Sequence, residues 1–474
     1  MVFSSHLFVF YFLPLVLAVY FALPRAARNG ALAVASYLFY GWANPVFLPL
    51  MLASTVLDYG AGRVIARHGR SVVGRWAVAA SVTGNLLMLG YFKYAGFVYS
   101  SLTEALGLPP IDGTLFAVTL PLGISFYTFQ SMSYTLDLWR GRAEVQKNLV
   151  DFACYVSMFP QLVAGPILRY SELADQLVER GHSFAKASRG VAFFALGMAK
   201  KILLANPCGE IADACFRTVG LGPLEAWYGA FAYGFQIYFD FSGYSDMAIG
   251  LGLILGFAFP KNFDSPYRAT SITDFWRRWH ISLSAWLRDY LYIPLGGNRR
   301  GRLPTYRNLA LVMLLGGLWH GAAWTFVAWG AFHGGLLATE RLIRERGWAE
   351  RWRRWLPAPL QVSPLKMAGT FLLVTLGWVL FRAEDIAAAG RYYRSMFGLS
   401  EASAAAGLLS GIVYVPALTV PFALAAVIVW RSPQTWDWSR VLTPLRAVAA
   451  LGLFAASLAV LELQGHNPFI YFIF

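Results

Sequence analysis

Apolar stretches recur from one end of the chain to the other, separated by short polar segments. Most approach the roughly 20 residues that an α-helix needs to cross a bilayer, and buried strands are much shorter. Two stretches are too short to cross alone, and two are long enough to contain a break or a pair of helices. We therefore expect an all-α polytopic membrane protein with about eleven transmembrane helices plus re-entrant or interfacial helices. The predicted stretches are Leu7–Leu23, Ala31–Trp42, Phe47–Tyr59, Trp76–Tyr99, Leu115–Leu136, Val150–Pro166, Gly190–Ala205, Trp227–Phe259, Leu309–Ile343, Leu365–Phe381, Gly411–Trp430 and Leu445–Leu463.

Composition agrees with this pattern. Of the 474 residues, 57% are hydrophobic and 14% are charged, which is too little charge to cover the surface of a soluble protein of this size. No shift in composition marks a separate soluble part, so we expect a single integral-membrane domain over residues 1–474. The formal net charge of +14 is typical of a membrane protein, because basic residues collect in its cytoplasmic loops. The apolar background argues against a nucleic-acid partner.

The charges of the loops predict how the chain is oriented. The segment Ala61–Arg75 holds four arginines and no acidic residue, so we place it in the cytoplasm. The loop after Tyr99 carries Glu104 and Asp112 without a basic residue, which favours the outer side. The segment Glu340–Arg354 carries six arginines and should face the cytoplasm again.

The segment Pro260–Asn308 differs in kind from the apolar stretches. It holds nine basic residues, three aspartates and several tryptophans, so it cannot lie in hydrocarbon as an ordinary span. We expect amphipathic helices on the cytoplasmic face, with a plain basic loop as the alternative. Trp276, His280 and Ser284 recur at intervals of four residues and would share one face of such a helix.

Arginines in this segment predict a phosphorylated cytosolic ligand. Guanidinium groups are well suited to phosphates, and a turn at Gly296-Gly297-Asn298 would add backbone N–H donors. Trp276 and Ser284 are further candidates for binding the same ligand. The arginines available are Arg277, Arg278, Arg288, Arg299 and Arg300.

Two carboxylates, Asp240 and Asp246, lie inside the apolar stretch Trp227–Phe259. Carboxylates are costly in a membrane and by default face a bundle interior or a water-filled cavity. Ser242 and Gly243 between them suggest a broken helix. A structural role, in capping half-helices or pairing with arginines, and a direct role in chemistry are both open.

Two histidines, His320 and His333, lie in the apolar stretch Leu309–Ile343. Glycines flank His320 at Gly317 and Gly321, and such glycines let a neighbouring helix or a ligand approach the backbone closely. Burial keeps an imidazole neutral, and a neutral imidazole is what a general base for acyl transfer needs. The two histidines are thirteen residues apart (333 − 320), which separates them around one helix and argues against a metal site between them. We expect His320 to be catalytic, with a buried hydrogen-bonded role as its alternative, and His333 to be structural.

Several blocks of this sequence are similar to a known family. The main ones are “DFWRRWHISLSAWLRDYLYIPLGGNRRG” and the following “LLGGLWHGAAWTFVAWGAFHG”. Further matches are “LPLGISFYTFQSMSYTLD”, “FPQLVAGPILRY” and “FQIYFDFSGYSDMAIGLGLILGF”. Together they resemble the membrane-bound O-acyltransferases (MBOAT), and within them the AlgI-type branch that acetylates exported polysaccharides such as alginate. The likeness extends over nearly the whole chain.

The resemblance implies an α-helical bundle around a central tunnel through the membrane. It places the core at residues 115–345, further helices at 365–463 and an aromatic tail at 467–474. It assigns the family's catalytic histidine to His320 and its second histidine to His280. The implied acyl donor is cytosolic acetyl-CoA, which is a substrate, and neither a bound cofactor nor a metal is implied. Asp240 and Asp246 are second-tier site candidates.

The resemblance also implies partners and a location. The chain would lie in the bacterial cytoplasmic (inner) membrane, in contact with lipid, and an extracytoplasmic SGNH-type acetyltransferase similar to AlgJ or AlgX would reach the polysaccharide. The terminal “NPFIYFIF” resembles a motif that carries the acyl group in related acylation systems, so Tyr471 is an acyl-carrier candidate. An interfacial aromatic anchor is the alternative for this tail.

Two other functions are open at this point. A related acyltransferase could act on peptidoglycan or teichoic acid instead. A transporter also combines broken helices with buried carboxylates, but it predicts paired half-repeats, which the sequence does not show.

Overall fold

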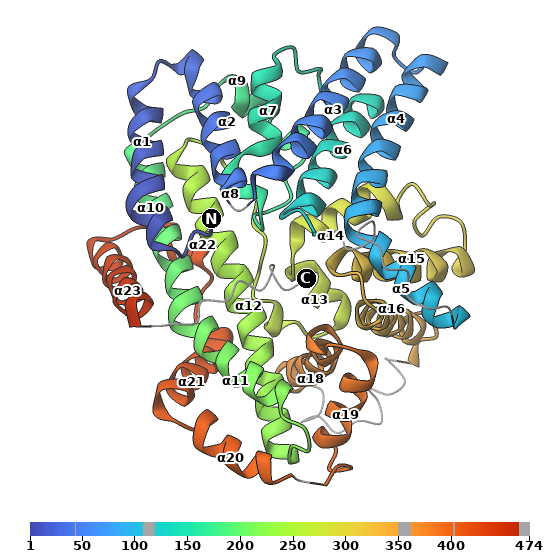
Figure 1. Cartoon of the computed structure of the whole chain (residues 1–474), viewed down its shortest axis with the longest axis vertical. Coiled ribbons are helices and arrows are strands. Elements are labelled where there is room, and N and C mark those ends of the chain that lie inside the picture. Colours follow the sequence, from blue (N-terminus) through green and yellow to red (C-terminus); the bar gives the residue numbers. More distant parts are fainter. Residues whose placement is uncertain (43, 108–118, 349–361, 402, 464–474) are drawn as a thin grey trace. The chain divides into compact units, whose positions relative to one another are not determined.

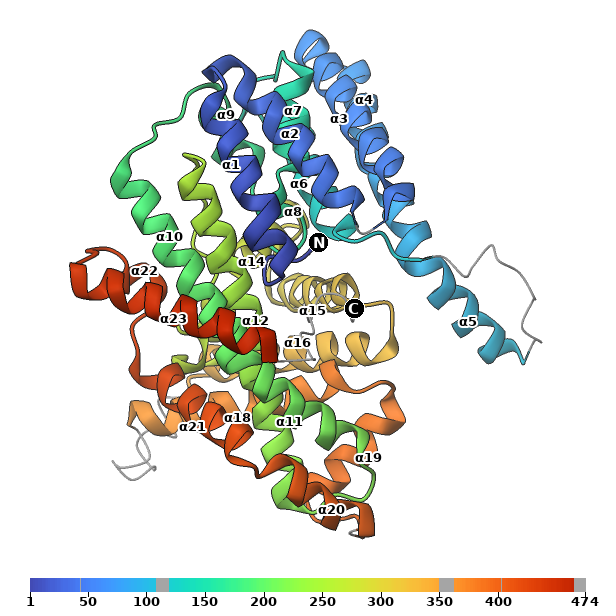
Figure 2. The ribbon, with the colours of Figure 1, turned by 60° about the vertical axis from the view of Figure 1, so that its left-hand side comes forward.

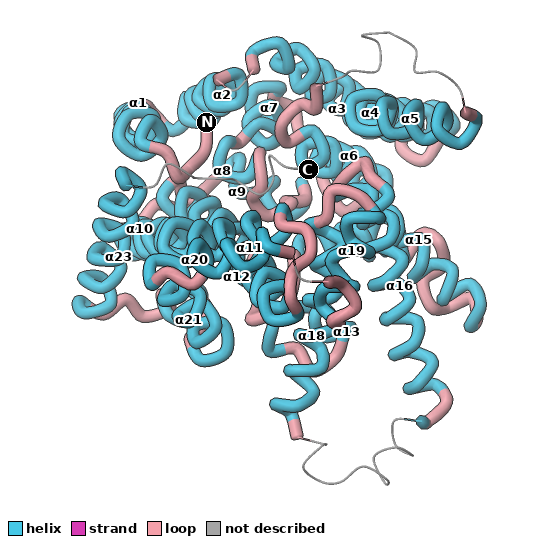
Figure 3. The backbone as a smooth tube through the Cα atoms, turned by 60° about the horizontal axis from the view of Figure 1, so that its bottom comes forward, coloured by secondary structure: helices cyan, strands magenta, loops and turns pink. Residues whose placement is uncertain are grey.

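The computed structural model describes residues 1–42, 44–107, 119–348, 362–401 and 403–463. Over these ranges every regular element is a helix and none is a strand (Figure 3). The prediction of an all-α protein is therefore confirmed. The acyl-carrier candidate Tyr471 lies outside the described residues.

The helices form two compact units. One unit comprises residues 1–194 and 244–260, and the other comprises residues 195–243 and 261–474. Helix α12, Pro223–Ile254, contributes its first part to the second unit and its end to the first. The cavity and both site histidines described below belong to the second unit.

The first unit contains η1 Leu7–Phe12, α1 Leu13–Ala22, α2 Arg25–Gly41, η2 Pro45–Phe47, α3 Leu48–His68, α4 Val72–Leu89, η3 Gly90–Tyr94, α5 Ala95–Leu106, α6 Ile124–Arg140, α7 Leu149–Ser157, α8 Phe159–Leu162, α9 Tyr170–Val178 and most of α10, Phe184–Ala199. Helices α3, α4 and α6 pack side by side (Figures 1 and 2). Between α3 and α4, Ser81 Oγ and Asn85 Nδ2 donate hydrogen bonds to the buried carboxylate of Asp58. These bonds offset the cost of placing a carboxylate between apolar helices.

The second unit contains η4 Lys200–Ala205, α11 Asn206–Arg217, the first part of α12, η5 Pro266–Arg268, α13 Ile272–Arg278, α14 Ile281–Leu287, η6 Arg288–Tyr292, α15 Arg302–His320, α16 Trp324–Glu345, α18 Ser363–Arg382, α19 Ile386–Met396, α20 Ala404–Val413, α21 Pro416–Arg431, α22 Thr435–Trp438 and α23 Pro444–Leu463. Helices α13, α16 and α18 meet around an aromatic core. The Trp378 indole lies 4.9 Å from that of Trp279 and 6.1 Å from that of Trp329, between ring centroids. All three indoles are buried, so this core fixes how the helices pack.

Five helical segments within the described ranges are long and apolar enough to cross a membrane. A bent pair, Gly407–Val413 with Pro416–Arg431, would make a sixth, although it turns by 72° at the break. The polytopic membrane prediction is confirmed, and the figure of about eleven crossings stays a prediction. The five segments are Pro45–His68, Val72–Leu106, Phe184–Arg217, Ser363–Arg382 and Pro444–Leu463.

The predicted break within α12 is wrong. The helix continues through Ser242 and Gly243 without interruption. A Cβ on Gly243 would lie 2.7 Å from the carbonyl oxygen of Gly197 on α10. The glycine therefore allows two helices to pack closely and does not end one.

Candidate active site

Helices α15 and α16 form an antiparallel pair whose closeness depends on glycine. A Cβ on Gly317 would clash with the carbonyl oxygen of Phe326. In the same way, a Cβ on Gly330 would clash with the carbonyl oxygen of Met313. Any side chain at either position would force the two backbones apart, so the close approach predicted at Gly317 is confirmed.

His320 is the last residue of α15, and the chain then turns into α16. The expectation that one helix separates His320 from His333 is wrong, because the chain reverses between them. Gly321 has an extended backbone (φ −161°, ψ 152°), and the Phe326 ring occupies the space that a side chain at Gly321 would need. The turn places the imidazole at a helix end, beside the start of the next helix.

Three aromatic rings meet the His320 imidazole edge to face. Its ring centroid lies 5.0 Å from that of Trp319, 5.3 Å from that of Trp329 and 5.1 Å from that of Phe381. The side chain is 8% exposed. Such rings exclude water and restrict how the imidazole can rotate, so His320 is held in one orientation.

His320 lines a cavity of about 170 Å³ whose walls are mostly aliphatic and aromatic. Polar groups at the cavity come from Ser284, Arg288 and Tyr292. Gly316, one helical turn before His320 on the same face of α15, also lines it. An apolar cavity with a few polar groups suits a short acyl group and the chain that carries it.

The structure brings Trp276 and Ser284 to this cavity, but not from one helix. The prediction of a shared helix face is wrong, because α13 ends before His280 and α14 begins after it. His280 itself adopts a left-handed backbone (φ 43°, ψ 57°), and the N–H of Ile281 donates to the carbonyl oxygen of Asn262 over 2.9 Å. Trp276 and Ser284 thus reach the cavity from two short helices, and His280 is not among the described residues that line it.

His280 is 1% exposed and packs against aromatic rings. Its imidazole lies 4.6 Å from the Phe241 ring and 5.9 Å from Trp319, between centroids, and Trp319 also contacts His320. Burial and the nearby His320 lower the pKa of His280 well below its ordinary value. The ring is therefore neutral at neutral pH. Its Nε2 atom has no hydrogen-bond partner among the residues that the structure describes.

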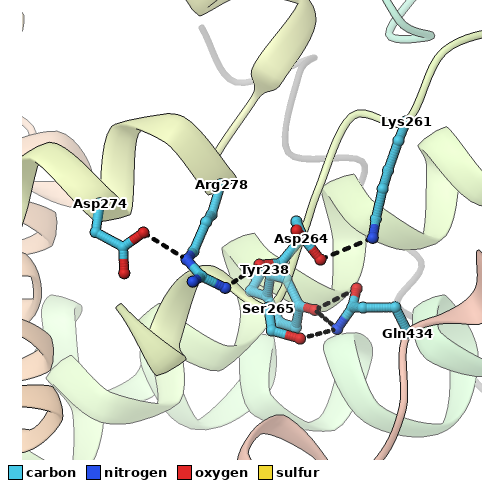
Figure 4. A network of polar contacts seen from close by, with 7 residues as sticks. All are labelled: Tyr238, Lys261, Asp264, Ser265, Asp274, Arg278 and Gln434. Carbon is cyan, nitrogen blue, oxygen red and sulfur yellow. Dashed lines mark hydrogen bonds and ion pairs between the residues drawn. The ribbon is translucent and has the colours of Figure 1, made fainter. Parts of the chain in front are cut away.

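The arginines predicted to bind phosphates have different surroundings. Arg278 forms an ion pair with Asp274 over 2.8 Å and donates to the carbonyl oxygen of Asp264 (Figure 4). Arg288 lines the cavity and pairs with the neighbouring Asp289. The remaining three are exposed and are not among the cavity's described lining residues, so their contact with a donor stays a prediction; they are Arg277, Arg299 and Arg300.

The two second-tier carboxylates lie in different units. Asp240, in the second unit, pairs with Lys201 over 3.1 Å, and both side chains are nearly inaccessible. The partner is a lysine on the π-helical segment η4 rather than one of the arginines that we considered. Asp246 is 6% exposed and belongs to the first unit. Neither carboxylate is among the described residues that line the cavity with His320.

Sequence reasoning missed several residues of this site, and three of them show why. Gly316 could have been found from its i, i+4 spacing to His320, which puts both on one helix face. Trp329, which contacts His320 from α16, gave no signal because the turn between the helices was not foreseen. Asn262 lies 18 residues before His280, in a segment without regular secondary structure, so no periodic pattern could have paired the two.

Comparison with known proteins identifies the family. Residues 41–355 match the model of MBOAT, the membrane-bound O-acyltransferase family. The chain is 45% identical to the “Probable alginate O-acetylase AlgI” of Pseudomonas putida, over 100% of both chains. It is 49% identical to the protein of the same name from Pseudomonas aeruginosa, over 84% of this chain and 75% of that one. It is also 36% identical to the “Peptidoglycan O-acetyltransferase” of Helicobacter pylori, over 85% and 81% of the two chains.

The family match covers more than half of the chain, and one relative aligns along its entire length. These similarities agree with the helical architecture and the apolar spans. The chain therefore belongs to the membrane-bound O-acyltransferase family and is a membrane-integral O-acetyltransferase.

Proposed function

We propose that this enzyme supplies acetyl groups from cytosolic acetyl-CoA for the O-acetylation of an exported, alginate-like polysaccharide. The observation that carries the proposal is that His320 opens onto an apolar cavity with Trp276, Ser284 and Arg288. Identities of 45% and 49% to alginate O-acetylases support the choice of polymer. The bacterial cytoplasmic membrane is the location that such a reaction requires, because donor and polymer lie on opposite sides.

In the proposed reaction, His320 acts as a general base. A nitrogen of its neutral imidazole takes the proton of the attacking hydroxyl group, and the hydroxyl oxygen forms a bond to the thioester carbonyl carbon. The carbon–sulfur bond of acetyl-CoA then breaks, and the leaving thiolate takes the proton back from the imidazolium. The acetyl group ends as an oxygen ester, and His320 is again neutral.

The donor would lie with its thioester in the cavity and its phosphates toward the arginines. Arg288 reaches the cavity itself, and Arg277, Arg299 and Arg300 are exposed cations in the same segment. Guanidinium groups bind phosphates with paired N–H donors. Trp276 and Ser284 would contact the part of the donor nearest the thioester.

Tyr471 is proposed as the hydroxyl that first receives the acetyl group. A phenol ester is a good acyl donor, so an extracytoplasmic SGNH-type acetyltransferase similar to AlgJ or AlgX could pass the acetyl group on to the polysaccharide. The sequence “NPFIYFIF” around Tyr471 is the basis for this step.

The principal test compares His320→Ala with His68→Ala, which alters an exposed histidine at the end of α3. We expect His320→Ala to abolish O-acetylation of the exported polysaccharide while the protein remains at its normal level in the membrane. His68→Ala should acetylate normally. Full acetylation by a stably inserted His320→Ala protein would refute the role of His320.

The acyl-carrier step and the polymer need separate tests. Inside-out vesicles given acetyl-labelled acetyl-CoA should release CoA and retain label on the chain, and Tyr471→Phe should remove that label. Label retained in Tyr471→Phe would refute the role of Tyr471 as acyl carrier.

Because one relative is a peptidoglycan O-acetyltransferase, the O-acetyl content of peptidoglycan should be measured alongside that of the exported polysaccharide, in cells with the native protein and with His320→Ala. If His320→Ala lowered the O-acetyl content of peptidoglycan alone, the alginate-like polysaccharide would be refuted as the substrate.

A further inference from the structure

The Asn262 side chain is buried beside His280 and accepts hydrogen bonds from the turn between α13 and α14. Its Oδ1 lies 3.2 Å from the backbone N of Ser282, 2.9 Å from Ser282 Oγ and 3.3 Å from His280 Nδ1. Its backbone carbonyl oxygen accepts from the N–H of Ile281. The side chain is 1% exposed. One residue thus holds both the backbone and the imidazole of this turn.

These contacts favour Nδ1 as the nitrogen of His280 that carries the proton, because Ser282 Oγ, which also lies 3.5 Å from Nδ1, already donates its hydrogen to Asn262. The backbone N–H of Ser282 can only donate, so the amide atom that faces it must be the oxygen of Asn262. That oxygen cannot donate, so its contact with His280 is a hydrogen bond only when Nδ1 carries the hydrogen. In a neutral imidazole with a protonated Nδ1, Nε2 keeps its lone pair.

The backbone conformation of His280 needs stabilising contacts, which Asn262 supplies. A positive φ of 43° in a residue other than glycine is uncommon and persists only where the surroundings enforce it. The N–H of Ile281, which α14 leaves without an intrahelical partner, bonds to Asn262 instead. Asn262 therefore compensates for the break that separates α13 from α14.

The residues next to Asn262 in the chain take part in a polar network (Figure 4). Lys261 forms an ion pair with Asp264 over 2.7 Å, and Arg278 donates to the carbonyl oxygen of Asp264. Gln434 donates to Ser265 Oγ over 2.8 Å. These contacts hold the chain on both sides of Asn262, and the amide itself is oriented by its bonds from Ser282.

We propose that Asn262 is a positioning residue for catalysis, which holds His280 as the Nδ1–H tautomer and keeps its Nε2 lone pair available to receive the hydroxyl proton from His320 and to pass it on to the leaving thiolate. The inference rests on the proposed function, because it gives His280 a part in the reaction at His320. Asn262 itself does not touch the donor or the acceptor.

Two features of His280 agree with an acceptor role. Its Nε2 atom is buried and has no partner among the described residues, which is costly unless the atom is used. The lowered pKa of His280 keeps the ring neutral, as a proton acceptor requires. The titratable group that lowers it is His320, and the charges on the neighbouring segment, Lys261 and Asp264, neutralise each other.

The direct test is the tautomer of His280 in the full-length protein labelled with ring-¹⁵N histidine and held in lipid nanodiscs. The signals that disappear in His280→Gln identify the residue. We expect a protonated Nδ1 and an unprotonated Nε2 near neutral pH. A predominant Nε2–H tautomer in the unaltered protein would overturn the proposal without any reference to activity.

Two variants test whether Asn262 sets this tautomer. Asn262→Leu keeps the volume of the side chain but removes the acceptor, so the Nε2–H tautomer should appear. Ser282→Ala is the matched control, because it removes the hydroxyl that contacts both Asn262 and His280 Nδ1 but leaves the amide oxygen and the backbone N–H that orients it. It should leave the tautomer unchanged. An Asn262→Leu protein with the native tautomer would contradict the proposal.

Activity then tests the catalytic consequence. Asn262→Leu should lower kcat by about 10- to 100-fold, which is below the full contribution of an acid–base group. Asn262→Asp keeps an acceptor for Nδ1–H but adds a negative charge that stabilises the imidazolium, so it should raise the pKa of His280. The acid limb of the kcat profile should move upward by about one to three pH units. An unshifted profile in Asn262→Asp would show that Asn262 is only structural.

The outcomes separate this inference from the proposed function. Suppose that His320→Ala is inactive while Asn262→Leu changes the tautomer without lowering kcat. The role of His320 as general base is then supported, and the positioning role of Asn262 is refuted. If His320→Ala keeps its activity, the proposed function fails, whatever the tautomer of His280.

Discussion

His320 and His333 lie against the same Trp329 ring, yet their surroundings differ. The indole centroid is 5.3 Å from the His320 imidazole and 4.9 Å from that of His333. His320 ends α15 and lines the cavity, whereas His333 lies within α16, is 0% exposed and is not among the cavity's described lining residues. Both imidazoles are buried, so burial does not explain why we assign them different roles. The difference is that, within the described ranges, only His320 of the two lines a cavity that a substrate can enter.

The packing of the two rings strengthens the contrast. His333 is enclosed by Trp276 and Phe332 as well as Trp329, at centroid distances of 5.2 and 5.4 Å for the first two. Neither of its nitrogens has a hydrogen-bond partner among the described residues. In effect His333 fills volume in an aromatic core, whereas His320 presents a nitrogen-bearing ring to the cavity.

The largest expected effect on activity comes from replacing His320, the histidine that lines the cavity. His320→Gln keeps a polar side chain of similar length but removes the base, so kcat should fall by about 10²- to 10⁴-fold. Binding of acetyl-CoA should be nearly unchanged, because the cavity walls remain. CoA release measures the first quantity and calorimetric titration of the purified protein measures the second. A variant with native kcat would erase the distinction between the two histidines.

The second-largest expected effect comes from filling the cavity with a side chain at Gly316. A Cβ on Gly316 would meet only Leu287 Cδ1 at 3.5 Å among the described residues, so the helix accepts a side chain there, but a large one enters the cavity. Gly316→Leu should raise KM for acetyl-CoA by about 10- to 100-fold, the range for misfit by a few methylene groups. Gly335→Leu is the matched control, because an added Cβ there meets nothing within 4 Å. Equal KM values in the two variants would mean that the donor does not use this cavity.

A smaller effect is expected at the edge of the cavity. Arg288 is 61% exposed and pairs with Asp289, so water and salt screen its attraction for a phosphate. Arg288→Gln should raise KM by about two- to fivefold, the range of an exposed ion pair. The difference should shrink at high ionic strength. Arg391→Gln, an exposed arginine on α19, provides the control. A KM for Arg288→Gln that is unchanged at low salt would contradict donor binding by Arg288.

The smallest effect on activity should come from His333. His333→Leu replaces two buried nitrogens by an apolar side chain of similar size, and such exchanges usually change the free energy of unfolding by less than about 1.5 kcal/mol. We expect kcat within about threefold of the native value, under ~0.7 kcal/mol on the barrier. Thermal unfolding and CoA release check both. A loss of kcat as large as that of His320→Gln would give His333 a catalytic part as well.

The helical architecture could be predicted because apolar length and charge act locally. The apolar stretch Leu309–Ile343 predicts helical structure, and Gly317 predicts close packing, which the clash of an added Cβ there confirms. The chain reversal at Gly321 was not expected, because a turn inside an apolar stretch leaves the average hydropathy unchanged. The contacts of Trp329 with both histidines follow from that reversal.

The break at His280 and the continuity of α12 show the same limit. A spacing of four residues suggests one helix through Trp276, His280 and Ser284, but the bonds from Asn262 stabilise the turn between two helices. Conversely, Gly243 suggests a break, but packing against Gly197 keeps the helix intact. In each case a partner distant in the sequence decided between two conformations that the local residues allow.

The sequence by itself determined that this protein is helical, spans a membrane and carries the motifs of an O-acyltransferase. The length of apolar stretches, the charge of loops and the order of residues in a motif are all properties of consecutive residues. The tertiary structure alone decided that His320 opens onto a cavity, that His333 is enclosed and that Asn262 holds His280. These last facts depend on contacts between residues far apart in the chain, and such contacts form only when the helices pack.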